Sequence, residues 1–143
     1  KFFDIMYNVK QKTMNDYIYD DGGRHKYFRM KYKKDRTGDC VVRALAIATQ
    51  EDYQDVRLEL WEDSFETGSM PNSKTTYERF LKKRGFVKEA KIKGYCLGQY
   101  PVSHNETYVV SLAHHLVCLD EGLVRDIWDC RSKYPYCTWR KLK

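Results

Sequence analysis

The chain has 143 residues, enough for one domain that buries a hydrophobic core without disulfide or metal support. Hydrophobic residues make up 42% of it, and no apolar run approaches the ~20 residues that a membrane-spanning helix needs. The start of the sequence shows no secretory signal pattern either. We therefore expect a globular domain with no membrane partner.

The charge is unevenly distributed. The net charge is +6, but residues 1–34 and residues 131–143 each carry +5, which leaves residues 35–130 at −4. Basic ends can attract nucleic acid or another acidic partner. They can equally be solvated termini that keep a protein soluble, and the sequence leaves both interpretations open.

The first 34 residues mix aromatic and charged side chains and are treated as an N-terminal segment, packed on the domain or extending from it. The run Asp20-Asp21-Gly22-Gly23 is a turn signal. Residues 25–33 (HKYFRMKYK) alternate in part, which favours a strand after that turn or an arm along the domain.

Two or three helices are expected next. Residues 40–49 (CVVRALAIAT) are apolar on nearly every face except at Arg43, which is typical of a central, buried helix with Asp39 as its N-cap. Residues 52–66 place apolar side chains at helical spacing. Residues 74–85 follow an N-cap candidate, Ser73, and end at a glycine.

From residue 86 onward the pattern changes to short β-branched or aromatic runs separated by turns, at 86–92, 107–113, 115–120, 123–129 and 136–141. Asp120-Glu121-Gly122 predicts a hairpin between the third and fourth runs. We therefore predict an α+β domain over residues 35–143, with N-terminal helices packed on a C-terminal antiparallel sheet.

Five cysteines are present: Cys40, Cys96, Cys118, Cys130 and Cys137. An odd number at irregular spacing argues against a disulfide framework and indicates a reducing, cytoplasmic setting. The spacing does not resemble a zinc finger or ribbon, so we expect no metal and no other cofactor. Apart from Cys40, these thiols are interpreted as packing residues.

Cys40 lies where the first helix begins. The free N–H groups and the dipole of a helix N-terminus lower the pKa of a thiol there and can hold an oxyanion. His115, at the start of a predicted strand, is the candidate base, with His114 as its rival. Asp126 lies across the hairpin, where it could orient the His115 ring.

Each of the three residues also has a structural interpretation. Cys40 could be a small buried hydrophobic residue, and His115 a surface or satisfied polar residue. Asp126 could pair with Arg125 or Arg131 for structural reasons. The order Cys, His, Asp on successive elements is what favours a catalytic triad.

The combination of GDCVVRALA, HHLVCL and DIWDC resembles the papain-like cysteine peptidase superfamily. It is also similar to small phage and plasmid proteins of that type. The resemblance covers about residues 35–141 and implies a nucleophilic Cys40, a catalytic His115 and an orienting Asp126. The order of residues in Asp126-Ile127-Trp128 is similar to the Asn-Ser-Trp run of papain.

One departure from the pattern concerns the oxyanion hole. Papain-like peptidases usually carry a glutamine about six residues before the cysteine, and here that position is Lys34. The resemblance implies a thiol hydrolase, such as a peptidase or amidase, or an acyl-transferase acting on a protein or peptide. The alternative is an inactive papain-like module that binds a host protein or nucleic acid through the basic ends.

Overall fold

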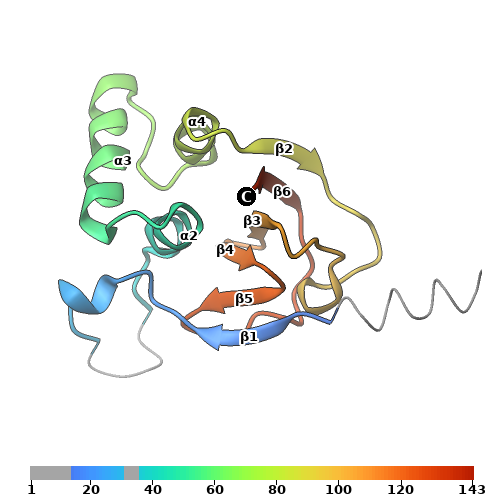
Figure 1. Ribbon diagram of the computed structural model, residues 1–143. Coiled ribbons are helices and arrows are strands. Elements are labelled where there is room, and N and C mark those ends of the chain that lie inside the picture. Colours follow the sequence, from blue (N-terminus) through green and yellow to red (C-terminus); the bar gives the residue numbers. More distant parts are fainter. Residues whose placement is uncertain (1–13, 31–35) are drawn as a thin grey trace, which may run out of the picture.

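Three helices cover one face of a six-stranded mixed sheet in the computed structural model, which describes residues 14–30 and 36–143 (Figure 1). The helices are α2 (Cys40–Thr49), α3 (Tyr53–Thr67) and α4 (Lys74–Lys83). Two short 3-10 helices, η1 (Arg24–Lys26) and η2 (Leu97–Gln99), lie in the connections. The structure confirms the α+β class and all three predicted helices.

The sheet has the strand order β1-β5-β4-β3-β6-β2. Its strands are β1 (Asp16–Tyr19), β2 (Val87–Ala90), β3 (Glu106–Leu112), β4 (His115–Asp120), β5 (Leu123–Asp126) and β6 (Cys137–Leu142). Every neighbouring pair is antiparallel except β1 and β5, which run parallel. The five runs predicted after residue 86 therefore correspond to β2 through β6.

The prediction of a purely C-terminal, antiparallel sheet was wrong in one strand. β1 comes from the N-terminal segment and lies before the Asp-Asp-Gly-Gly turn, whereas the sequence left open a strand or an arm after the turn, at 25–33. The described part of that stretch forms η1 and a coil, and residues 31–33 lie outside the described residues, as do residues 1–13.

Local hydrogen bonds explain why the chain turns where it does. The Asp20 and Asp21 carboxylates accept hydrogen bonds from the backbone N–H groups of Gly22 and Gly23, at 2.9 and 3.0 Å. A Cβ at Gly22 would lie 2.9 Å from the carbonyl oxygen of Arg43, so only glycine allows this approach to α2. The turn thereby connects β1 to the helical layer.

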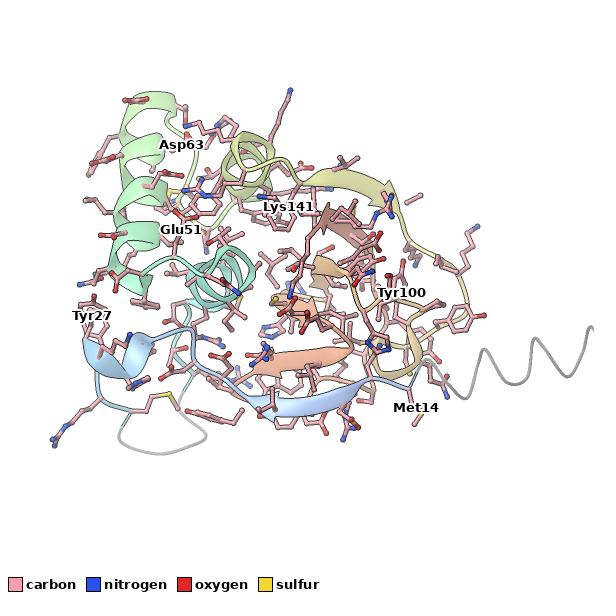
Figure 2. The ribbon with its side chains drawn as sticks, viewed as in Figure 1. Met14, Tyr27, Glu51, Asp63, Tyr100 and Lys141 are labelled. Carbon is pink, nitrogen blue, oxygen red and sulfur yellow. The ribbon has the colours of Figure 1, made fainter. Side chains whose placement is uncertain are left out.

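Helix α2 lies between α3 and the sheet and contacts β3, β4 and β5 (Figure 1). A hydrophobic cluster that includes Leu45, Leu81, Val109 and Trp139 fills this interface. A second cluster, which includes Tyr100 and Val117, covers the face of the sheet away from the helices. Tyr100 is labelled on that side in Figure 2. Since both faces are covered, β3 and β4 are buried along most of their length.

The hairpin between β4 and β5 closes with two residues, Glu121 and Gly122. Both have positive φ, +54° and +76°, which matches the twist that a two-residue hairpin requires. The predicted hairpin is confirmed. Among the described residues, no helix is long and apolar enough to cross a membrane.

Candidate active site

Cys40 is the first residue of α2 and is partly buried between that helix and β4. Burial raises the pKa of its thiol, but a hydrogen bond to His115, the backbone N–H of Leu116 and the positive charge of Arg43 together lower it below the ordinary value. The thiolate form is therefore favoured at this position.

His115 is the first residue of β4, and its side chain is 10% exposed. Burial lowers the pKa of the imidazole, but hydrogen bonds to Asp126, Cys130 and Cys40 raise it well above the ordinary value. Nε2 of the ring bonds the Oδ2 atom of Asp126, and the same ring is hydrogen-bonded to the thiol of Cys40. The opposite pKa shifts of thiol and imidazole favour a thiolate–imidazolium pair.

His114, the rival base, is a turn residue. It lies between β3 and β4 with φ +53° and is exposed. The structure therefore brings His115, and not its neighbour, to the thiol and the carboxylate.

Asp126 is the last residue of β5 and is 2% exposed. The β4–β5 register pairs Cys118 with Arg125, so continuing it by one residue places Asp126 opposite Val117. Val117 shares a sheet face with His115, two residues away, so the carboxylate reaches the ring diagonally across the two strands. The β4–β5 hairpin thus brings Asp126 to His115, as the Asp-Glu-Gly turn predicted.

Arg43 is the charged residue whose role the sequence did not reveal. It lies on α2, three residues after Cys40, and is 5% exposed. Its Nη1 donates to Asp126 Oδ1 at 2.6 Å and its Nε to Asp39 Oδ1 at 2.8 Å. A single charge within an apolar helix was the available signal, because a buried charge needs a partner.

The partners expected for Asp126 are occupied elsewhere. Arg125 pairs with Asp20 and Asp120, and Arg131 pairs with Asp129. The carboxylate of Asp126 instead accepts from Arg43, from His115 and from its neighbouring backbone N–H, that of Ile127, at 2.7 Å.

Asp39 is at the N-cap position, but its side chain makes no capping hydrogen bond. The carboxylate instead accepts from Tyr53 Oη at 2.6 Å, from Arg24 Nη1 at 3.0 Å and from Arg43. Although burial raises the pKa of Asp39, hydrogen bonds from Thr37, Tyr53 and Arg43 and the positive charge of Arg43 lower it to about 2. The carboxylate of Asp39 therefore does not cap the helix but pairs with the Nε side of the Arg43 guanidinium, whose Nη1 binds Asp126.

Cys130 has a further contact besides the packing expected for it. Its side chain is fully buried in the second cluster, and its Sγ lies 3.8 Å from Asp126 Oδ2. His115, Asp126 and Cys130 form the one group among the described residues whose ligand atoms could hold a metal, all within 4.8 Å. The Arg43 guanidinium, bound to the same carboxylate, opposes a cation there.

Trp128 covers one side of the imidazole. Its ring centroid lies 5.1 Å from that of His115 at an interplanar angle of 51°, and the side chain is 40% exposed. An apolar ring at this position excludes part of the solvent from the His115–Asp126 hydrogen bond and strengthens it.

Two hollows of about 540 Å³ each flank the Cys40–His115 pair. Arg36, Thr37 and Trp128 line the first, and Asn72, Lys74 and Ser111 line the second. Cys40, His115, Gly38 and His114 line both, so the two hollows are halves of one cleft across the thiol. A polymer chain laid along it would pass over Cys40.

No protein-family model, no curated protein and no solved structure matches this chain. The position of the expected glutamine, Lys34, lies outside the described residues.

Proposed function

We propose that the protein is a papain-like thiol hydrolase or acyl-transferase, phage- or mobile-element-encoded, that works in a reducing, cytoplasmic setting. The observation that carries the proposal is that His115 contacts both Cys40 and the buried carboxylate of Asp126, and that Cys40 and His115 line the cleft. The opposite pKa shifts of thiol and imidazole support it, because a nucleophile paired with an acid is what acyl transfer requires.

The reaction begins when the Cys40 thiolate attacks the carbonyl carbon of an amide or ester. A C–S bond forms, and the carbonyl electron pair moves to oxygen. When the tetrahedral intermediate collapses, the His115 imidazolium donates its proton to the leaving nitrogen or oxygen, which leaves a thioester on Cys40. Water, or an amine in a transferase, then attacks the thioester carbonyl while His115 takes the proton from the attacking group. The C–S bond breaks, which releases the acid or the new amide and restores the Cys40 thiolate beside the His115 imidazolium.

The N-terminus of α2 supplies a place for the oxyanion. The Asp39 side chain is engaged with Arg43, Tyr53 and Arg24 and makes no bond to the first N–H groups of the helix. The backbone N–H of Cys40 and the helix dipole can therefore stabilise the developing negative charge. In this proposal the backbone performs part of the role of the glutamine amide.

The direct test is the rate at which iodoacetamide alkylates each thiol near neutral pH, resolved by mass spectrometry. We expect Cys40, whose thiol is hydrogen-bonded to His115, to react at least ten times faster than Cys96, which is also partly buried. Probes with ubiquitin-like, peptidoglycan-peptide and generic peptide electrophiles then report the substrate class. Any turnover found must be lost in Cys40→Ala; turnover that persists in this variant would refute the proposal.

A non-catalytic module that binds nucleic acid is the second candidate, suggested by the basic ends. At the C-terminal end, Arg140 pairs with Glu89 and Glu106, and Lys143 pairs with Asp120 and Glu121. These pairs offset much of the charge that would attract phosphate. Binding to unrelated nucleic-acid sequences with steep salt dependence, together with an unreactive Cys40, would favour the module.

A further inference from the structure

The cleft has a charge pattern of its own. Among the described residues that line its two hollows there is no Asp or Glu. Each half has an exposed cation instead, Arg36 on one side of Cys40 and Lys74 on the other. Arg43 also reaches the first hollow, but Asp39 and Asp126 offset its charge.

Arg36 and Lys74 form no ion pair with any described carboxylate. Most arginines in the described part of the chain do, namely Arg24, Arg43, Arg79, Arg84, Arg125, Arg131 and Arg140. Arg36 follows a stretch, residues 31–35, whose sequence contains three lysines and one aspartate. The positive end of the α2 dipole adds to the same potential.

Arg36 and Lys74 can each bind a carboxylate of a substrate, but in different ways. The planar guanidinium of Arg36 can bind a carboxylate through two parallel hydrogen bonds, in the hollow that Trp128 also lines. The ammonium of Lys74, at the first residue of α4, is a mobile point charge next to Asn72. An extended peptide would place its side chains in both halves of the cleft.

We propose that this cleft binds acidic peptide segments, with an Asp or Glu side chain on each side of the amide bond that Cys40 attacks. The inference rests on the proposed function and specifies its substrate class. Arg36 and Lys74 are the specificity-determining residues, each for one half of the cleft.

The contribution of each cation is modest because both are exposed. Solvent and salt screen such pairs, so one contact changes a rate by a few-fold, about 2- to 5-fold. Two contacts acting together give roughly a tenfold preference at low ionic strength. The preference must shrink as salt is added.

The experiment uses three short peptides that carry the same thiol-reactive electrophile, flanked on both sides by Asp, Asn or Lys. The second-order rate of Cys40 modification is measured at low and at high salt, about 20 and 300 mM. We expect the Asp peptide to react about tenfold faster than the Asn peptide at low salt, and the Lys peptide to be slowest. High salt should bring the three rates together.

Variants assign the effect to the two residues. Arg36→Gln and Lys74→Gln should each remove part of the Asp preference, and the double variant should remove nearly all of it. Lys82→Gln is the matched control, because Lys82 is an exposed lysine on the same helix as Lys74 and lines neither half of the cleft. It should leave the preference unchanged.

The outcomes separate the two proposals. Equal rates for the three peptides, or a fastest Lys peptide, would overturn the acidic-substrate inference even if iodoacetamide labels Cys40 rapidly. A Cys40 that reacts with iodoacetamide as slowly as Cys96 would instead overturn the proposed function. A preference that survives in the double variant would assign the selectivity to other residues and also overturn the inference.

Discussion

Arg43 and Asp126 form a buried ion pair, with Nη1 and Oδ1 2.6 Å apart and side chains 5% and 2% exposed. Arg43 lies on the helix that Cys40 begins, and Asp126 on the strand that orients His115. The pair therefore joins the nucleophile to the carboxylate of the proposed triad across the interface between helices and sheet. Since the guanidinium occupies Oδ1, it is Oδ2 that faces the imidazole.

Arg43→Met should lower the free energy of unfolding and also slow the alkylation of Cys40 near neutral pH. Removal of one member of a buried pair leaves an unpaired charge and costs about 3–5 kcal/mol. The positive charge of Arg43 also helps to lower the pKa of Cys40, so the pH midpoint of Cys40 alkylation should rise. Urea denaturation and alkylation rates between pH 5 and 10 measure the two effects.

Arg84→Met is the matched control for this prediction. Arg84 also bridges two carboxylates, Glu51 and Glu59, but it lies away from the cleft. Its loss should cost stability without moving the alkylation midpoint. If Arg43→Met does not fold, Arg43→Lys can replace it, because lysine keeps the positive charge but cannot bridge two carboxylates as the guanidinium does. Arg43→Lys should shift the pH midpoint of Cys40 alkylation less than Arg43→Met. An unchanged midpoint in every folded variant would contradict the role of Arg43.

His115→Ala should raise the pKa of Cys40, because the imidazole contact is the largest favourable influence on the thiolate. Alkylation of Cys40 at pH 7 should slow by about 10- to 100-fold. His114→Ala provides an adjacent histidine as control and should leave the rate unchanged, because His114 is an exposed turn residue and is not among the groups that shift the pKa of Cys40. If His114→Ala slowed Cys40 alkylation more than His115→Ala, His114 would be the histidine that lowers the pKa of the thiol.

Asp39 should make stability depend on acid pH. Its folded pKa of about 2 lies below the ordinary 3.8, so the carboxylate contributes stability above pH 4 that is lost as the pH falls through 2. The contribution is about 2 kcal/mol. In Asp39→Asn the fall in unfolding free energy between pH 5 and pH 2 should be smaller by that amount; an identical fall in both proteins would contradict the prediction.

Metal should not be needed at the site. A cation bound by His115, Asp126 and Cys130 would displace the shared Nε2 proton and lie next to the Arg43 charge. We expect protein equilibrated with Zn²⁺ and then desalted to hold far less than one ion per chain, and EDTA to leave both the melting temperature and Cys40 labelling unchanged. One tightly held zinc per chain, lost in Cys130→Ala, would contradict this and identify a metal centre.

Local patterns were sufficient for much of the architecture. The apolar run after Asp39 predicted α2 with Cys40 as its first residue, and Asp-Glu-Gly predicted the hairpin that brings Asp126 toward His115. These features are encoded in neighbouring residues, because helix periodicity and turn conformation depend on side chains a few positions apart.

Only the tertiary structure decided the rest. Local patterns did not predict the parallel pairing of β1 with β5 or the partners of Arg43 and Cys130. They also did not decide that Asp126 contacts His115 and not His114. Arg43 and Asp126 are 83 residues apart, and which carboxylate meets a buried guanidinium depends on how the helical layer is seated on the sheet. That seating is a property of the packed core, in which side chains from many elements must fit at once.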